Sequence, residues 1–409
     1  MKVVVIGGGP AGIMCALQAS EKTKNEVLLL EKNEKLGKKL YITGKGRCNV
    51  TNNVLPSQFL NSVVTNPKFL YSAINTFSSQ DTINFLSSAG LKTIVERGNR
   101  VFPSSQKSSD VIKTFESMLA QNNVNIKLNC CVNAIKKNFN DKFVVETNSG
   151  KFVCDCVVVA TGGVSYSSTG STGDGYKFCK AFGHDIISTK PSLVPIILKE
   201  YDGHLAGLSL KNVCATIKVA GKTYAQFGEM LFTHNGVSGP IILSLSAFVN
   251  KVDISNATLS IDLKPALSEK QLDDRLLRDF ASSHTKCLKN YLKELLPNSL
   301  IEEFINKLNC DGLTRLCDIN KETRLNIMHL LKNFSYDILS LEDIEFAIVT
   351  SGGVDVKQIN PKNMMSKLVP NLFVVGEALD VDALTGGFNI QIALSTGYLA
   401  GNYLKNLGE

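Results

Sequence analysis

The first residues with a spacing suited to chemistry are glycines near the start of the chain. Positions 3–12 read Val-Val-Val-Ile-Gly-Gly-Gly-Pro-Ala-Gly, so an apolar run leads into the pattern Gly7-x-Gly9-x-x-Gly12. Such glycines allow a tight turn and close approach of the backbone to a pyrophosphate, whose charge the free N–H groups of a following helix can bind. Glu31, nineteen positions after Gly12, is placed to accept hydrogen bonds from ribose hydroxyls. The pattern predicts a dinucleotide site; the alternative is a glycine-rich turn of an unrelated α/β protein.

A second apolar run ends in a glycine and an acid near the other end of the chain. Residues 371–377 read Asn-Leu-Phe-Val-Val-Gly-Glu, and residues 385–390 read Thr-Gly-Gly-Phe-Asn-Ile. A helix that begins there would direct its partially positive N-terminus at the pyrimidine edge of a flavin, where the reduced ring carries negative charge. The alternative is a glycine-rich loop that caps an ordinary core helix over residues 389–403. Together with the N-terminal pattern, these segments favour FAD as the dinucleotide.

Residues 43–49, Thr-Gly-Lys-Gly-Arg-Cys-Asn, form a third cluster. Two glycines expose backbone N–H groups, while Lys45 and Arg47 supply positive charge for phosphate oxygens or for an anionic reduced flavin. An exposed basic turn is the alternative. Cys48 could form a covalent link to the flavin or act as a redox thiol, but most free cysteines serve as small buried apolar residues. We therefore expect non-covalent FAD.

The spacing of other reactive residues disfavours several kinds of chemistry. The eleven cysteines include no C-x-x-C pair, since Cys130 and Cys131 are adjacent and Cys154 alternates with Cys156. This arrangement indicates reduced thiols rather than a metal site, a disulfide framework or a disulfide reductase. The histidines lack metal-ligand spacing, and no serine–histidine–acid arrangement is recognisable. Because the glycine-rich residues 170–175 do not join a strand to a helix, we expect no separate NAD(P) domain.

The elements that must position these residues follow from the hydrophobic pattern. We expect short alternating antiparallel strands from about residue 192, and residues 267–334 have the spacing of helices. The strand at 156–160 runs into Thr161-Gly162-Gly163, where small residues let the backbone pass close to a cofactor. Further strands are predicted at 3–6, 27–30, 126–128, 143–147 and 343–350, helices at 67–89 and 108–122, and a loop over 35–53.

These elements predict an α/β fold with a discontinuous, Rossmann-like FAD-binding domain of the two-dinucleotide-fold type. A β-barrel-like and helical domain is inserted into it. The length of 409 residues agrees with two or three domains. The predicted domains are residues 1–190 with 350–409 for FAD, residues 191–266 with 335–349 for the β-barrel-like insert, and residues 267–334 for the helical part.

The net charge of +7 is spread along the chain, because lysines alternate with acids rather than forming a run. This argues against a dedicated nucleic-acid surface. The first apolar stretch is too short for a signal peptide, and no run approaches the roughly 20 apolar residues that cross a bilayer. We expect a cytoplasmic monomer or homodimer without a membrane partner.

Four segments resemble the successive signatures of one bacterial flavoprotein family. They are residues 35–52, 160–175, 231–240 and 376–389, and the resemblance spans essentially the whole chain. Members of this family are called aminoacetone oxidase-like or 3-dehydro-bile-acid reductase-like (BaiN-type) oxidoreductases. The family more often has glycine where Lys45 stands and proline where Ser167 stands, which bears on the tuning near the flavin and not on the fold.

The resemblance implies an FAD-binding fold interrupted by an insert that is part β-barrel and part helical. It also implies which residues contact FAD, with Val132 as a backbone contact to adenine. Carried over by motif, the cofactor-binding residues are Gly7, Gly9, Pro10, Ala11, Gly12, Glu31, Lys32, Gly44, Lys45, Gly46, Arg47, Cys48, Asn49, Val132, Thr161, Gly162, Gly163, Gly376, Glu377, Gly387, Phe388, Asn389 and Ile390.

Two side chains are candidates for catalytic proton transfer. His234, within Phe-Thr-His-Asn-Gly-Val-Ser-Gly-Pro at 232–240, lies on the expected insert. A histidine titrates near neutrality and could supply a proton as hydride leaves or arrives at flavin N5. Tyr166 is the second candidate, as a hydroxyl donor. The alternative for each is a structural role.

The expected function is an FAD-dependent oxidoreductase. In the favoured version NAD(P)H visits as a transient co-substrate, and hydride passes through FAD to an activated double bond of a small hydrophobic or carbonyl-conjugated molecule. The close rival is an amine oxidase of the aminoacetone type that releases hydrogen peroxide. An RNA-modifying flavoprotein and a non-catalytic flavin sensor are the remaining alternatives.

Overall fold

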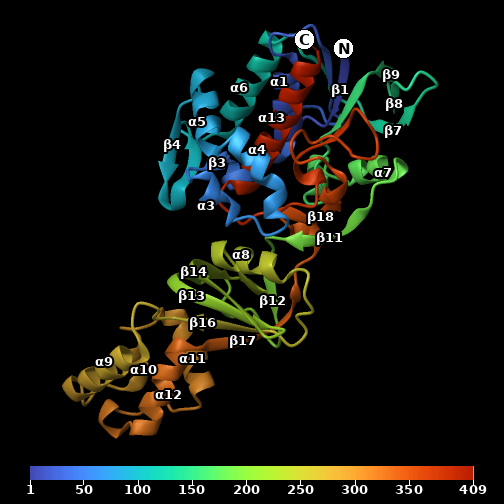
Figure 1. The fold of residues 1–409 in the computed structure, drawn as a ribbon. Coiled ribbons are helices and arrows are strands. Elements are labelled where there is room, and N and C mark those ends of the chain that lie inside the picture. Colours follow the sequence, from blue (N-terminus) through green and yellow to red (C-terminus); the bar gives the residue numbers. More distant parts are fainter. Residues whose placement is uncertain (409) are drawn as a thin grey trace. The chain divides into compact units, whose positions relative to one another are not determined.

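The chain divides into two compact units in the computed structural model, which describes residues 1–408 (Figure 1). Unit 1 consists of Met1–Ser192 and Asp343–Glu409, and unit 2 consists of Leu193–Glu342. Unit 1 is therefore built from both ends of the chain. The segment between them forms a unit with its own hydrophobic core.

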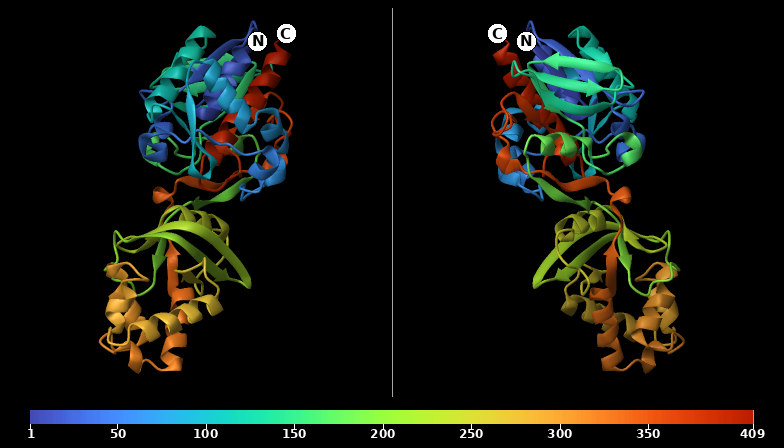
Figure 2. Two further views of the ribbon diagram at one scale, coloured as in Figure 1. Left: turned by 90° about the vertical axis from the view of Figure 1, so that its left-hand side faces the viewer. Right: turned by 90° about the vertical axis from the view of Figure 1, so that its right-hand side faces the viewer.

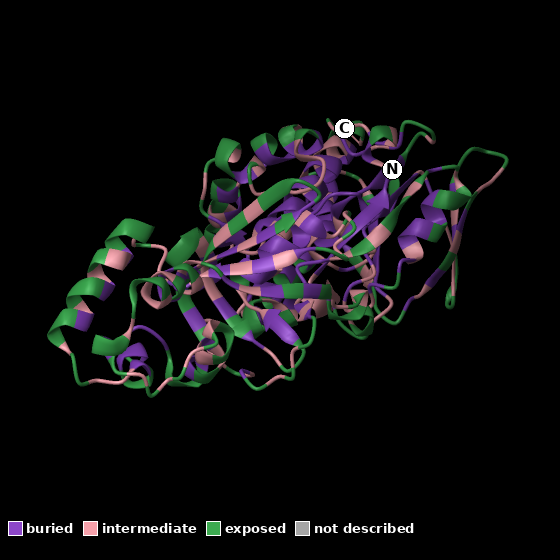
Figure 3. Cartoon of the chain, turned by 90° about the horizontal axis from the view of Figure 1, so that it is seen from below, coloured by how far each residue is buried: buried purple, intermediate pink, exposed green. Residues whose placement is uncertain are grey.

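The central sheet of unit 1 is parallel throughout, with the strand order β19-β10-β1-β2-β6. Its inner strands are runs of Val, Ile and Leu, as expected when helices or other layers cover both faces of a sheet. Burial is nearly complete on the three inner strands β1, β2 and β10, and Figure 3 shows buried ribbon in purple gathered near the labelled N-terminus. The strands are β1 (Lys2–Ile6), β2 (Glu26–Leu30), β6 (Asn125–Lys127), β10 (Cys156–Val159) and β19 (Leu372–Val374).

Two helices from opposite ends of the chain, α1 (Pro10–Ser20) and α13 (Phe388–Leu407), lie side by side in unit 1 (Figures 1 and 2). A Cβ added at Gly397 would lie 2.2 Å from the Ala11 carbonyl oxygen, and one at Gly401 would lie 2.5 Å from the Cys15 oxygen. Because both contacts advance by four residues in the same direction, the two helices are parallel. Glycine at these two positions lets the backbones touch.

The other elements of unit 1 surround this layer. Residues 51–103 contribute a small sheet of order β3-β5-β4, and residues 132–154 contribute the three-stranded sheet β7-β8-β9. The strands are β3 (Thr51–Asn52), β4 (Thr93–Glu96), β5 (Arg100–Pro103), β7 (Val132–Lys137), β8 (Phe143–Thr147), β9 (Gly150–Cys154), β11 (Ile186–Ser192) and β18 (Val349–Val354). The helices are α2 (Lys38–Ile42), α3 (Pro56–Leu60), α4 (Tyr71–Thr76), α5 (Ser79–Ser88), α6 (Ser108–Gln121) and α7 (Asp174–Ala181).

Unit 2 contains a closed barrel of order β12-β15-β14-β13-β16-β17 and five helices. Alternation of buried and exposed residues along β13 matches a barrel wall with one face inward. The strands are β12 (Ile196–Leu198), β13 (Ser209–Val219), β14 (Lys222–Phe232), β15 (Gly236–Ser238), β16 (Thr258–Asp262) and β17 (Phe334–Leu341). The helices are α8 (Pro240–Val249), α9 (Glu269–Ser282), α10 (Leu288–Leu292), α11 (Ile301–Leu308) and α12 (Lys321–Lys332).

The predicted fold class is confirmed, and two of the predicted elements are wrong. The expected loop over 35–53 contains α2, which begins after Gly37 and buries Leu40. The strand expected at 343–350 starts only at Val349, where pairing with β11 begins. The preceding residues 344–346 form a 3₁₀ turn instead, closed by the hydrogen bond from Ala347 N to Ile344 O.

The close contact of α1 with α13 yields a stability prediction. In an ordinary helix interior, Gly→Ala stabilises by about 1 kcal/mol. For Gly397→Ala we expect a loss of about 2 kcal/mol or more, because the new methyl would overlap the Ala11 backbone and separate the helices. Urea unfolding measures the difference. Asn402→Ala on the same helix is the control and should be nearly neutral, so equal effects of the two variants would contradict the packing argument.

Candidate cofactor site

The carboxyl ends of the central strands meet at one edge of the parallel sheet, where ligands of open α/β sheets bind. β1 delivers the turn at 7–9, β2 delivers Glu31, β10 delivers residues 160–163, and β19 delivers residues 376–377. These segments also touch: a Cβ at Gly7 would lie 2.4 Å from the Ala160 oxygen, and one at Gly376 would lie 2.8 Å from the Ala11 Cβ. The structure therefore brings together four of the predicted site segments.

The glycine turn before α1 leaves open space at one position only. Gly12 lies against the Gly7 carbonyl oxygen, which would be 1.9 Å from an added Cβ, and Gly7 has φ +109°. Gly9, in contrast, has nothing within 4 Å of an added Cβ. Its extended backbone conformation does not require glycine, so the absence of a side chain there serves to leave space. No side chain caps the helix that follows, and Pro10 occupies its first position. Open space before an uncapped helix N-terminus fits a pyrophosphate.

Glu31 is buried at the end of β2 and faces the same turn. Its Oε2 accepts a hydrogen bond from Gly8 N at 2.7 Å, and its Oε1 accepts from Asn33 N at 2.8 Å. Oε1 also accepts from Asn33 Nδ2 at 2.7 Å, whereas Oε2 accepts a single hydrogen bond and so retains acceptor capacity, since each carboxylate oxygen has two lone pairs. The carboxylate is thus held rigidly beside the turn, as required for hydrogen bonds from a ribose.

The N-terminus of α13 forms a second end of the cradle. Gly387 has φ +100°, and an added Cβ would lie 2.5 Å from the Thr51 oxygen and 2.9 Å from Asn49 Oδ1. Asn49 Oδ1 and Thr51 Oγ1 are buried and have no hydrogen-bond partner in the described chain. Buried polar atoms are normally paired, so these two leave hydrogen-bonding capacity unused beside the start of α13. Thr161 Oγ1 is also unpaired, but it lies against α7, where a Cβ added at Gly175 would be 2.2 Å away.

The two helix N-termini point in the same direction, but α13 begins further out. Gly397 of α13 is level with Ala11, which stands two residues after Gly9, the N-cap of α1. Gly387, the N-cap of α13, therefore lies about eight residues further out than Gly9, which corresponds to about 12 Å of helix at 1.5 Å per residue. An elongated dinucleotide with a phosphate at one end and an anionic ring at the other matches two partially positive helix ends at this spacing. The residues present therefore fit FAD.

A buried polar network lies between these ends and was not predicted. Lys39 Nζ contacts Glu377 Oε2 at 2.8 Å and Ser165 Oγ at 2.7 Å. Glu377 Oε1 also accepts from Ser165 Oγ at 2.9 Å and from Thr350 N at 2.9 Å. The charge of Glu377 is therefore already balanced by Lys39, and its Oε1 is fully occupied by donors of the protein. Lys39 lies within the motif at 35–52, so its position there was the one available signal.

The predicted basic loop is only partly directed toward the cradle. Gly44, Lys45 and Gly46 all adopt left-handed backbone conformations, and Lys45 is exposed. Arg47 instead pairs with Glu96 and lies over the Phe102 ring at 4.0 Å. Lys32 likewise forms an ion pair with Asp174 at 2.8 Å. The charges of Arg47 and Lys32 are thus balanced within the protein.

The remaining predicted residues occupy several places. Asn389 closes the loop before α13 by bonding Ala383 N at 2.9 Å, and Phe388 packs edge-on against Phe59. Gly162 and Gly163 follow β10, Ile390 is half-buried on α13, and Val132 begins β7. Tyr166 lies in unit 1 with φ +52°, near the Lys39 ammonium. His234 is exposed between β14 and β15 in unit 2.

Within residues 1–408, no group of three or more His, Cys, Asp or Glu side chains is arranged to hold a metal ion. No described helix combines the length and apolar character needed to span a bilayer.

The burial of Cys48 yields a prediction about its reactivity. Its side chain is fully buried, and burial raises the pKa of its thiol to about 12. The thiol stays protonated below that pH, so at pH 8 only about one molecule in ten thousand carries the reactive thiolate. We expect iodoacetamide to leave Cys48 unlabelled in the native protein and to label exposed Cys317, as read by peptide mass spectrometry. Rapid native labelling of Cys48 would revive a redox role.

Comparisons with known proteins identify the family of the chain. The sequence profile described as "HI0933-like protein Rossmann domain" matches residues 1–403. The chain is 31% identical to a ribosomal RNA dihydrouridine synthase of Haemophilus influenzae, with 97% of this chain and 96% of the relative covered. It is 28% identical to a 3-dehydro-bile acid delta(4,6)-reductase of Clostridium scindens, with 98% of each covered, which confirms the resemblance seen in the motifs.

Solved structures show the same fold at low sequence identity. A flavocytochrome c3 fumarate reductase superposes with a TM-score of 0.51 at 16% identity, covering 99% of this chain and 78% of its own. A 3-ketosteroid-delta4-(5alpha)-dehydrogenase of Rhodococcus jostii gives a TM-score of 0.51 at 14% identity, covering 98% and 96%. The chain therefore belongs to the HI0933-like Rossmann family, and its class is that of the FAD-dependent oxidoreductases.

Proposed function

We propose that this enzyme reduces a C=C bond conjugated to a carbonyl group, with NAD(P)H as the source of electrons. The observation that carries the proposal is a reaction shared by relatives with different substrates. A dihydrouridine synthase saturates the 5,6 double bond of uracil, which is conjugated to the 4-oxo group. A 3-dehydro-bile acid delta(4,6)-reductase acts on double bonds conjugated to the 3-oxo group. In both substrates the double bonds are conjugated to a carbonyl, which makes a carbon of the bond electrophilic enough to accept hydride.

The site residues support this chemistry by binding and orientation. FAD, when bound, supplies the hydride. The open turn at Gly9 would receive the pyrophosphate and Glu31 the adjacent ribose. Asn49 Oδ1 would accept a hydrogen bond from a ring N–H of the pyrimidine edge, and the Thr51 hydroxyl could donate or accept there. The partially positive N-terminus of α13 would favour the anionic form of the reduced ring. Tyr166 and His234 remain the proposed proton donors.

The distribution of charge favours RNA as a second candidate for the substrate. Unit 1 carries 27 Lys and Arg against 20 Asp and Glu, whereas unit 2 carries 17 of each. The whole net charge of +7 therefore belongs to the unit that contains the cofactor site. A scattered pattern along the sequence thus becomes a basic excess in one unit. Such an excess favours a polyanionic substrate such as RNA over an uncharged small molecule.

Anaerobic stopped-flow spectroscopy tests the reaction. We expect NADH or NADPH to bleach the flavin absorbance of the purified holoenzyme, and a conjugated acceptor to restore it without oxygen. Two acceptors separate the substrate classes: a 3-oxo-Δ4 steroid and a uridine-containing ribosomal RNA fragment, with mass spectrometry to detect a gain of two hydrogens. Bleaching by an amine and peroxide release in air would instead establish the oxidase.

The glycine turn gives a second prediction, which tests cofactor binding alone. For Gly9→Ala we expect an unchanged melting temperature of the apoprotein and roughly tenfold weaker FAD binding, since the methyl would enter the space left for the ligand. Gly12→Ala is the contrasting variant and should unfold the domain, because its Cβ would lie 1.9 Å from the Gly7 oxygen. Thermal melting of the apoprotein measures the stability of each variant, and FAD titration by fluorescence measures its affinity for the cofactor. Unchanged FAD affinity in Gly9→Ala would contradict the assignment.

A further inference from the structure

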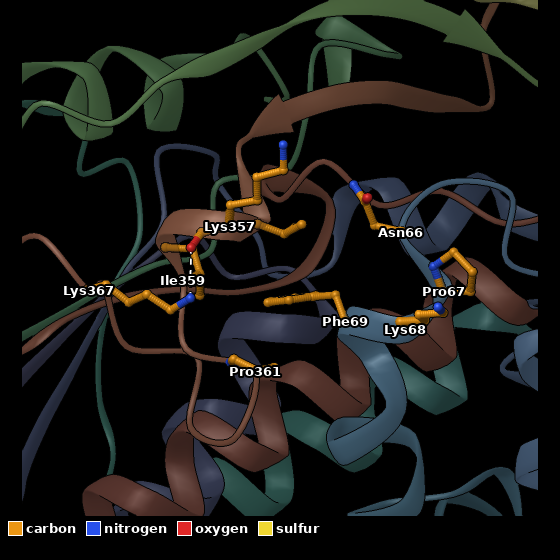
Figure 4. Close-up of a pocket in the computed structure, with 9 residues that line it drawn as sticks. Asn66, Pro67, Lys68, Phe69, Lys357, Ile359, Pro361 and Lys367 are labelled. Atoms are coloured by element: carbon orange, nitrogen blue, oxygen red, sulfur yellow. Dashed lines mark hydrogen bonds between the residues drawn. The ribbon is translucent and has the colours of Figure 1, made fainter.

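A pocket of about 450 Å³ in unit 1 is not used by the proposed cofactor site (Figure 4). Its lining combines lysines with apolar side chains and contains no acid. The pocket is formed by Asn66, Pro67, Lys68, Phe69, Val356, Lys357, Ile359, Pro361 and Lys367. Its volume falls within the range of small-ligand sites, which is about 300–1,000 Å³.

The three lysines give the pocket a positive charge that the protein does not balance. Among residues 1–408, no carboxylate forms an ion pair with Lys68, Lys357 or Lys367. All three lysines are exposed. Lys367 Nζ donates to the Lys357 carbonyl oxygen at 2.7 Å, which fixes one ammonium at the rim (Figure 4). Asp355 accepts from the Lys357 backbone amide and is not a lining residue. Unbalanced ammonium groups around one cavity fit an anion such as phosphate.

The walls of the pocket are fixed by hydrogen bonds rather than formed by loose side chains. Asn66 Nδ2 donates to the carbonyl oxygen of Asp380 at 2.7 Å and to its Oδ2 at 3.0 Å. On the other side, Lys367 N donates to the Gln358 oxygen at 2.8 Å, next to a β-bridge between Ile359 and Ser366. The apolar floor is preformed as well, because Phe69 and Ile359 are already buried.

The pocket is linked to the cofactor cradle through Asp380, which stands three residues after Glu377. Asp380 N also donates to the carbonyl oxygen of Val354 at 3.0 Å, two residues before the lining residue Val356. Asp380 therefore contacts Asn66 on one side of the pocket and the end of β18 on the other. A ligand in the pocket would therefore lie against the segment that continues from the cradle.

We propose that this pocket binds a nucleoside phosphate, with the phosphate on the lysines and the base against Phe69 and Pro361, which the buried Ile359 supports. The unit is either a free nucleotide, such as part of a pyridine dinucleotide, or a nucleotide within an RNA strand. This proposal goes beyond the reaction proposed above, and its test reads binding rather than turnover. Failure of the reductase assay therefore leaves it intact.

Charge reversal on the FAD-loaded protein tests the pocket. Two probes are titrated, a fluorescent N-methylanthraniloyl-ADP and a short fluorescein-labelled single-stranded RNA. For the double variant Lys68→Glu with Lys357→Glu we expect roughly tenfold or greater weakening of at least one probe. The matched control, Lys24→Glu with Lys113→Glu, makes the same change in net charge at exposed sites of unit 1 outside the pocket lining. It should change either affinity less than twofold.

The pattern of losses identifies the source of the phosphate. Weakening of the ADP probe assigns the pocket to a free nucleotide, weakening of RNA alone assigns it to a strand, and inorganic phosphate should compete in both cases. The proposal is overturned if neither probe binds the wild type, or if pocket and control variants weaken binding equally. Retained flavin absorbance checks the fold, and the neutral pair Lys68→Gln with Lys357→Gln repeats the test if the charge reversal impairs folding.

Discussion

The contact between α1 and α13 is the constraint on which the cofactor cradle depends. Two helices that begin at opposite ends of a 409-residue chain touch backbone to backbone at Gly397 and Gly401. Because they are parallel, both partially positive N-termini face the same edge of the sheet. The offset between them sets the length of ligand that both can bind. A larger residue at either glycine would separate the helices and with them the two ends of the site.

The same constraint explains why the intervening unit can be large. A domain inserted into another leaves the host fold intact when its two connections leave from neighbouring points. Here β11 ends at Ser192 and β18 begins at Val349, and these two residues are paired partners in one antiparallel ladder. The chain therefore leaves and re-enters unit 1 at adjacent positions. Unit 2 can fold around its own barrel core without altering the parallel sheet.

The parts of the site that the sequence predicted are those with local signals. The turn at Gly7 to Gly12, Glu31 and the Gly387 loop are each recognisable within one short segment, because a strand, a glycine and a helix start follow one another. The network of Lys39, Ser165 and Glu377 has no such signal. Ser165 lies 126 positions and Glu377 lies 338 positions after Lys39, so only the folded chain brings the three residues together. The strand expected at 343–350 is wrong for a related reason, since pairing with β11 rather than local composition decides where β18 begins.

The ion pair of Glu377 with Lys39 limits what that residue can do. Its carboxylate accepts hydrogen bonds from Lys39, Ser165 and the Thr350 amide, so its charge is balanced before any ligand binds. A carboxylate engaged in this way is poorly suited to act as a base. We infer instead that it positions Lys39 and the loop after β10. By contrast, Asn49 and Thr51 each retain a buried unpaired oxygen, and Glu31 Oε2 accepts only one hydrogen bond. The capacity for new hydrogen bonds therefore lies at the two ends of the cradle, whereas its middle is a rigid support.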